Sequence, residues 1–184
     1  MDAFLKKVLF TCILAIFTIT TVNAIELNKT YINGNIKLVL NGQGVRDKFF
    51  MDLYKCGLYL IQNSNNNKQI LQNNEPINLR LQVVSSLITS DKMKNGIKKG
   101  FENSTNGKTE LLKTKIETFI KVFAQMKEND IYDFFYSPKE GVKIYKNSNL
   151  ISTIDGENFK KALFGIWIGN NPAQESLKKD LLGL

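Results

Sequence analysis

The sequence IYDFFYSPKEGVKIYKNSNLISTI, residues 131–154, contains three short runs of β-branched, aromatic and aliphatic residues. The runs cover residues 131–136, 142–145 and 150–154, and the polar connections between them contain a proline, a glycine, serines and asparagines. Runs of this length with turn-forming residues between them are typical of strands joined by hairpins. The segment therefore predicts an antiparallel meander of three strands.

Three more runs in the first half of the chain predict further strands. Residues 36–40 form the first run, and Gly42 and Gly44 follow it, which signals either a turn or a close approach between backbones. Residues 49–61 form a long run of aromatic and aliphatic side chains, and residues 77–86 have alternating character. Together with the meander, these runs predict one antiparallel sheet.

Helical periodicity separates the two groups of strands and returns after the second group. Apolar residues recur every three or four positions in residues 90–103 and 109–129, which predicts two amphipathic helices. A third helix is predicted after a cap at Asp155, and a last one after a cap at Asn171 with Pro172 at its first position. The order strands, helices, strands, helices predicts an α+β fold with an antiparallel sheet.

The first residues of the chain have the pattern of a cleavable signal peptide. Lys6 and Lys7 precede an apolar run at residues 8–19, and small side chains lead to a cleavage position after Ala24. The apolar run is shorter than the roughly 20 residues that a membrane-spanning helix needs. We therefore expect a signal peptide at residues 1–24 and an exported protein, periplasmic in a Gram-negative bacterium and secreted otherwise, with one domain at residues 25–184.

The composition excludes several classes of site. The sequence contains no histidine, and Cys56 is the only cysteine after the predicted cleavage position. A histidine-based triad, a thiolate cluster and an intrachain disulfide are therefore excluded from the mature chain, and we predict neither a metal nor a cofactor. Cys56 is expected to be a small buried residue, with a reactive thiol as the alternative.

The chain is basic, with a formal net charge of +8. Its lysines are scattered and no nucleic-acid-binding motif accompanies them, so we expect a solvated basic surface and no nucleic-acid partner. The positive charge is compatible with a peripheral contact with anionic lipid head groups. The pattern identifies no protein partner.

Two stretches of the sequence resemble a known family. The first contains LNGQGVR at residues 40–46 and YKCGLYL at residues 54–60. The second reads ALFGIWIGNNP at residues 162–172 and continues with SLKKDLLG at residues 176–183. Together they resemble the chalcone isomerase-like family, specifically its exported bacterial branch, and the likeness covers essentially the whole mature chain.

The resemblance implies the open-faced β-sandwich of chalcone isomerase, in which helices cover a large antiparallel sheet and leave a cleft beside it. Plant enzymes of the family close a flavanone ring in this cleft, whereas other members hold a fatty acid there without catalysis. Arg46 falls on the family's arginine, which orients an oxyanion in the enzymes and meets a carboxylate in the lipid-binding members. A planar guanidinium suits both tasks, because it can donate two parallel hydrogen bonds. The alternative for Arg46 is a salt bridge with Asp47 or Asp52.

The other catalytic positions of the family depart from its pattern. Tyr54 stands where the enzymes have a threonine, and Thr89 is near the position of the catalytic tyrosine. Gly96 takes the place of an asparagine, with Asn95 one position away, and Lys160 that of a hydroxyl residue in the C-terminal helix. The loss of even one donor to a developing oxyanion costs about 10²–10³ in rate. Chalcone isomerase activity is therefore not expected.

Three functions remain open. The leading hypothesis is a non-catalytic protein that binds a fatty acid or other small apolar anion in the cleft, with Arg46, Tyr54 and Tyr59 as ligand-binding candidates. The second is an isomerase of the intramolecular lyase type, or another enolate-stabilising enzyme, with Arg46 and Thr89 as candidate catalytic residues. The third is an exported structural or interaction protein with a filled cleft, in which Trp167 and the terminal helix serve a partner. The alternative for Trp167, which we favour, is a position in the core. An apolar cavity that reaches Arg46 favours the first hypothesis over the third.

Overall fold

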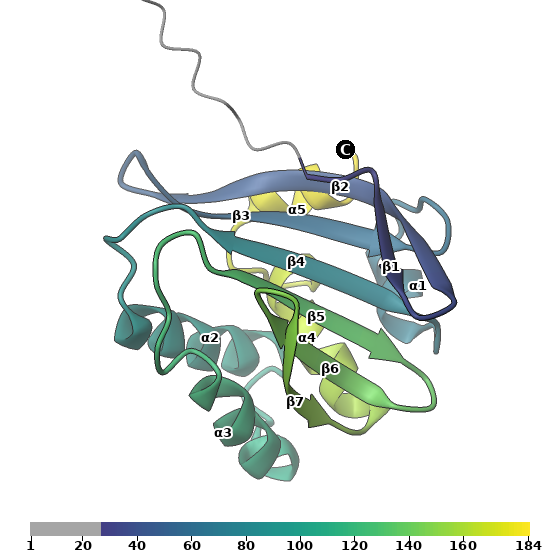
Figure 1. Cartoon of the computed structure of the whole chain (residues 1–184). Helices are drawn as coiled ribbons and strands as arrows, with labels where there is room; N and C mark the ends of the chain where they lie inside the picture. The colour runs from purple at the N-terminus through teal and green to yellow at the C-terminus, as the bar shows by residue number, and fades with distance from the viewer. Residues whose placement is uncertain (1–26) are drawn as a thin grey trace, which may run out of the picture.

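The sheet contains seven strands that pair in chain order, each antiparallel to the next (Figure 1). The computed structural model describes residues 27–184, and the signal peptide predicted for residues 1–24 lies outside them. The last three strands confirm the predicted meander, and β3 and β4 overlap the runs predicted at residues 49–61 and 77–86. The strands are β1 (Thr30–Asn33), β2 (Ile36–Lys48), β3 (Met51–Leu60), β4 (Ile77–Val83), β5 (Ile131–Ser137), β6 (Gly141–Lys146) and β7 (Asn149–Ile154).

Helices gather on one side of the sheet, and the main hydrophobic core lies between these two layers (Figure 1). Helix α2 packs against α4, and α5 lies against β2. This arrangement confirms the predicted α+β fold, and no helix within residues 27–184 is long and apolar enough to cross a membrane. The helices are α1 (Asn67–Gln72), α2 (Ser90–Ser104), α3 (Lys113–Lys121), α4 (Glu157–Ile168) and α5 (Glu175–Leu181), with a short 3-10 turn, η1 (Glu110–Leu112), before α3.

The glycines after the first predicted strand lie inside β2, which does not end at residue 40 but continues to Lys48. A Cβ atom at Gly44 would lie 2.6 Å from the carboxylate of Asp180 in α5, and one at Gly42 would overlap the carbonyl oxygen of Asp180. Of the two interpretations that the sequence allows, the close backbone approach is therefore the one that holds. It brings the C-terminal helix directly onto β2.

The two C-terminal helices begin later than their predicted caps. Helix α4 has Gly156 rather than Asp155 at its N-cap, and α5 has Gln174 rather than Asn171. Residues 169–174 form an irregular link between α4 and α5, so Pro172 does not open a helix. The shift matters for function, because this link contributes to the wall of the cleft described below.

A two-residue turn joins β2 to β3, and both of its residues, Phe49 and Phe50, have positive φ angles of 51° and 63°. Turns with this backbone favour asparagine and glycine, because a bulkier residue in the left-handed region costs about 1 kcal/mol or more. The side chains are 78% and 105% exposed, so packing inside the protein does not offset this cost. The hairpin tip is therefore strained and apolar at the same time.

Relieving this strain is expected to stabilise the protein in water. The double change Phe49→Asn and Phe50→Gly should raise the free energy of unfolding by about 1–2 kcal/mol, because the new residues suit a left-handed backbone. Urea denaturation followed by circular dichroism measures the change. An unfolding midpoint that stays the same or falls would show that the two phenylalanines support the hairpin in water after all.

Two residues discussed from the sequence lie in the core between sheet and helices. Trp167 is 1% exposed and stacks on Phe134, with ring centroids 5.9 Å apart, which agrees with the expected core position. Cys56 is fully buried, and burial raises the pKa of its thiol well above the usual value. A buried thiol with a raised pKa is a poor nucleophile, so Cys56 is a packing residue.

Candidate ligand-binding cleft

A cleft of about 680 Å³ lies between the β2–β3 hairpin, helix α2 and the link from α4 to α5. Volumes of this size are typical of small-molecule sites. The cleft reaches both Arg46 on β2 and Tyr54 on β3. Its remaining walls are mainly apolar, with side chains that include Leu53, Ile88, Met93, Ile97, Ile166 and Ala173.

Arg46 is held in place by neutral acceptors. Its Nη1 donates to the backbone carbonyl of Asp47 (2.7 Å) and to Oε1 of Gln174 (2.5 Å) in the link before α5. No carboxylate of residues 27–184 forms a salt bridge with the guanidinium, so the alternative pairing with Asp47 or Asp52 is not present; the Asp47 carboxylate instead accepts from Nε2 of Gln174 (2.6 Å). The positive charge of Arg46 is therefore positioned and uncompensated, which suits it to an anion.

Tyr54 is the cross-strand partner of Arg46 and lies on the same face of the sheet. Its side chain is buried, and its hydroxyl oxygen accepts a hydrogen bond from Nε1 of Trp167 (3.3 Å). Burial raises the pKa of the Tyr54 phenol, an effect that the charge of Arg46 and the bond from Trp167 offset only in part. Tyr54 is thus protonated at neutral pH and keeps an O–H donor beside the guanidinium.

Tyr59 does not join these two residues. It lies five positions after Tyr54 on the same strand, and because side chains alternate between faces, it points to the opposite side of the sheet. There it packs with Tyr31, Leu38 and Phe135 in a small second cluster. The expectation that Tyr59 could anchor the ligand head is therefore corrected by the alternation of the strand.

Comparison with family models gives a match to the chalcone isomerase-like family over residues 19–183. The chain belongs to this family. No curated protein sequence is significantly similar to it. Among solved structures, its fold is similar to that of a fatty-acid binding protein from Arabidopsis thaliana, with a TM-score of 0.66 and 13% identity over 85% of this chain and 90% of the other. The open-faced β-sandwich implied by the sequence resemblance is thereby confirmed.

In this chalcone isomerase-like chain, the hydroxyl groups of Thr89 and Ser90 accept hydrogen bonds from backbone N–H groups in and near helix α2. The Thr89 hydroxyl accepts from the backbone N–H of Lys92 (3.3 Å) as the N-cap, and Ser90 Oγ accepts from the backbone N–H of Met126 (3.3 Å). Neither residue lines the cleft with Arg46. The candidate catalytic pairing of Arg46 with Thr89 is therefore not assembled in this structure, for a local reason: the hydroxyl groups cap and brace α2.

Gly96 lines the cleft from the middle of α2, where the enzymes of the family have an asparagine. A Cβ atom at Gly96 would meet no heavy atom within 4 Å, so the missing side chain opens space in the cleft. Gly100, one turn further along, is different, because its Cβ would lie 2.6 Å from the side chain of Ile166. The first glycine widens the cleft, and the second allows α2 to pack on α4.

Replacement of either glycine by alanine is expected to change the stability of the protein, in opposite directions at the two positions. Gly96→Ala should raise the free energy of unfolding by about 0.5–1 kcal/mol, because alanine favours the helix and has room. Gly100→Ala is the matched control and should lower the free energy of unfolding, because the methyl group collides with Ile166. Thermal denaturation of both variants provides the comparison. Equal shifts would contradict the assignment of open space to Gly96.

Lys160, at the position of a hydroxyl residue in the enzymes, is buried away from the cleft. Its Nζ donates to the carbonyl oxygens of Ile70 (3.1 Å), Leu71 (2.9 Å) and Asn73 (2.7 Å), at the C-terminal end of α1. The ammonium also lies 5.6 Å from the ring centroid of Tyr136. Lys160 thus fastens α1 to α4 and takes no part in the cleft.

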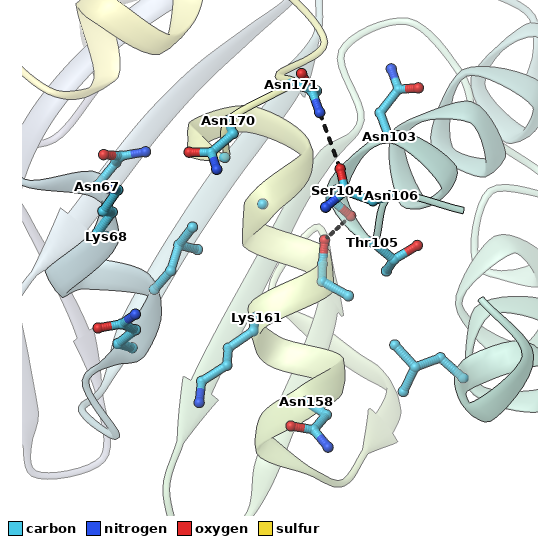
Figure 2. Close-up of a pocket in the computed structure, with 16 residues that line it drawn as sticks. Asn67, Lys68, Asn103, Ser104, Thr105, Asn106, Asn158, Lys161, Asn170 and Asn171 are labelled. Atoms are coloured by element: carbon cyan, nitrogen blue, oxygen red, sulfur yellow. Dashed lines mark hydrogen bonds between the residues drawn. The ribbon is translucent and has the colours of Figure 1, made fainter. Parts of the chain in front are cut away.

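Sequence reasoning missed Gln174, which connects Arg46 to the link before α5. It also missed a second hollow of about 490 Å³ on the outer side of α4, between α1 and the end of α2 (Figure 2). In it, Ser104 Oγ donates to the carbonyl of Ala162 (2.8 Å), and Asn171 donates to Asn106 (3.3 Å). The lining is dominated by neutral amides and contains no carboxylate, so this hollow offers hydrogen bonds but no acid–base pair.

Proposed function

We propose that this chalcone isomerase-like protein binds a fatty acid, or a similar apolar molecule with one anionic head, without catalysing a reaction. The observation that carries the proposal is an apolar cleft that reaches two hydrogen-bond donors, Arg46 and Tyr54, on adjacent strands. Burial of the hydrocarbon chain against the cleft walls supplies affinity. The guanidinium and the phenol supply charge-assisted hydrogen bonds to a carboxylate. The similar fold of a fatty-acid binding protein supports the same class of ligand.

The composition of the cleft supports binding rather than catalysis. Tyr54 is the only hydroxyl-bearing residue among the described residues that line it. Ring closure of a chalcone needs hydrogen-bond donors at the oxygen that becomes negatively charged. Tyr54 occupies one of the four positions that supply such donors in the enzymes. The other three positions are occupied here by Thr89, Gly96 and Lys160. The first is a helix cap, the second has no side chain, and the third binds carbonyl groups elsewhere.

The proposal includes export, because residues 1–24 have the pattern of a signal peptide and the motifs resemble those of the exported bacterial branch. Fractionation of host cells, followed by determination of the N-terminal sequence of the purified protein, tests this part separately. A mature chain that begins at Ile25 would support export. A chain that retains Met1 in the cytoplasmic fraction would contradict it.

The ligand is tested by extraction and by titration. Protein purified under mild conditions is extracted with organic solvent, and mass spectrometry is expected to find a long-chain carboxylic acid in an amount comparable to the protein. The delipidated protein is then titrated with palmitate by calorimetry, which should give saturable binding to one site. The absence of both an extracted acid and palmitate uptake would overturn the proposal.

A further inference from the structure

Exposed apolar side chains gather around the mouth of the cleft. Phe49 and Phe50 project from the tip of the β2–β3 hairpin, and Met51 and Leu87 are exposed beside it. Phe49 and Phe50 are the only aromatic residues among the large exposed hydrophobic side chains of the described part of the chain. We use the term "mouth patch" for these four residues. Such a concentration of apolar surface on a protein marks an interaction site.

The backbone conformation at the tip of the mouth patch shows that its two phenylalanines do not favour folding in water. Phe49 and Phe50 occupy the two positions of a turn that favours asparagine and glycine. Their only aromatic interaction in the described chain is the approach of Lys48 Nζ to the Phe49 ring, at 5.4 Å. Strain and exposure at the same two residues indicate that an external contact compensates for both.

The mouth patch is continuous with the cleft. Phe49, Met51 and Leu87 line the cleft from its outer end, and Phe50 lies beyond them at the hairpin tip. A hydrocarbon chain that leaves the cleft past these residues would therefore meet apolar side chains before it meets water. An aqueous protein–protein interface does not require this continuity, but transfer of a lipid between a bilayer and the cleft does.

Lysines lie along the cleft beside the apolar tip. Lys48, Lys92 and Lys99 all border the cleft. Of the acidic groups nearby, Asp91 is paired with Lys94 and Glu102 with Lys99, so these two pairs carry no net charge and leave Lys48 and Lys92 as the cations beside the patch. The Asp47 carboxylate accepts a hydrogen bond from the neutral amide of Gln174. Asp52, at the base of the hairpin, is exposed, and the chain as a whole carries +8. Aromatic side chains with flanking lysines on a basic protein match the interface of an anionic bilayer, where each basic residue near the surface adds attraction.

We infer that the mouth patch docks the protein on an anionic lipid bilayer, with Phe49 and Phe50 inserted at the level of the head groups. In this orientation the cleft opens onto the membrane, and its ligand enters and leaves without crossing water. The docking itself stands on the surface described here, whereas its purpose, exchange of the ligand, rests on the proposed fatty-acid binding.

The test is flotation of the full mature protein with lipid vesicles. Vesicles of phosphatidylcholine with roughly one quarter phosphatidylglycerol should carry the wild type upward, and pure phosphatidylcholine should carry much less. Phe50→Gly should reduce the partition onto the anionic vesicles by about tenfold or more, because it removes one inserted phenyl ring. Leu111→Ser is the matched control, since Leu111 is 98% exposed on η1, outside the mouth patch, and this variant should float as the wild type does.

Palmitate titration without vesicles separates this inference from the proposed function. Phe50 does not line the cleft, so Phe50→Gly should keep the palmitate affinity of the wild type while it loses flotation. Flotation without palmitate binding would support docking and overturn only the proposed ligand. Palmitate binding without flotation would overturn docking. Sedimentation that shows a dimer broken by Phe50→Gly, again without flotation, would assign the mouth patch to a second copy of the chain instead.

Discussion

Replacement of Arg46 by methionine is expected to weaken the binding of palmitate by about tenfold to a hundredfold. The guanidinium lines the cleft without a carboxylate partner in the described chain, so a bound carboxylate would be its counter-charge. Hydrogen bonds to charged groups contribute about 1.5–3 kcal/mol, which corresponds to one or two powers of ten in Kd. Methionine keeps much of the aliphatic stem, so the change isolates the charged group. Calorimetric titration of the delipidated variant measures it.

Three controls make this prediction specific. The corresponding fatty alcohol, which carries no charge, should bind wild type and Arg46→Met with similar affinity. Arg46→Lys should have an intermediate effect, because an ammonium retains charge but not the bidentate fork. Tyr59→Phe removes a hydroxyl on the opposite face of the sheet and should leave palmitate binding unchanged. Equal palmitate affinities for wild type and Arg46→Met would remove Arg46 from the site.

Replacement of Lys160 by methionine is expected to lower the free energy of unfolding by about 2–4 kcal/mol. The change leaves the carbonyl groups of Ile70, Leu71 and Asn73 without their donor, and each buried polar group left unpaired costs about 1–3 kcal/mol. Lys161→Met is the matched control one position along α4. Its partner is Glu157 at 2.6 Å on the surface, and exposed pairs of this kind contribute little to stability, because water screens them. Similar losses for both variants would contradict the anchoring role of Lys160.

The burial of Lys160 also leads us to expect that the free energy of unfolding depends on pH. Burial lowers the pKa of Lys160 from 10.5 to about 8, and the charge of Glu157 offsets this only in part. Between these values the unfolded chain binds more protons than the folded chain, so stability increases as the pH rises. The difference in unfolding free energy between wild type and Lys160→Met should therefore grow from pH 8 to pH 10.5. A difference that stays constant or shrinks over this range would show that the ammonium is fully stabilised by its three carbonyl partners.

The sheet and most helices could be predicted because their signals are local. The three short apolar runs in residues 131–154 and the apolar period of α2 reflect which side chains face the core, and these strands and this helix formed where the patterns placed them. The extent of β2 could not be predicted in this way. A glycine in a turn and a glycine beneath another element look alike in a sequence, and only the position of α5 shows that Gly42 and Gly44 belong to the second kind.

The residues of the site differ in the same way: some could be predicted from nearby sequence, and others depend on contacts between distant parts of the chain. Arg46 and Tyr54 could be proposed from the motifs, and the register of β2 and β3 explains why they meet. Tyr59 could have been assigned to the other face from its odd spacing relative to Tyr54. Gln174 could not have been found, because its contact with Arg46 depends on the path of an irregular link 128 positions away.

Trp167 is the only tryptophan in the sequence, and its indole N–H donates to the hydroxyl oxygen of Tyr54 beside the cleft. A ligand that accepts the Tyr54 proton in a hydrogen bond changes the electron density on that oxygen, and therefore the surroundings of the indole. The protein thus carries an internal fluorophore that is joined by one hydrogen bond to a residue of its cleft. Filling and emptying of the cleft become visible as a change in ultraviolet emission, in real time and without a dye.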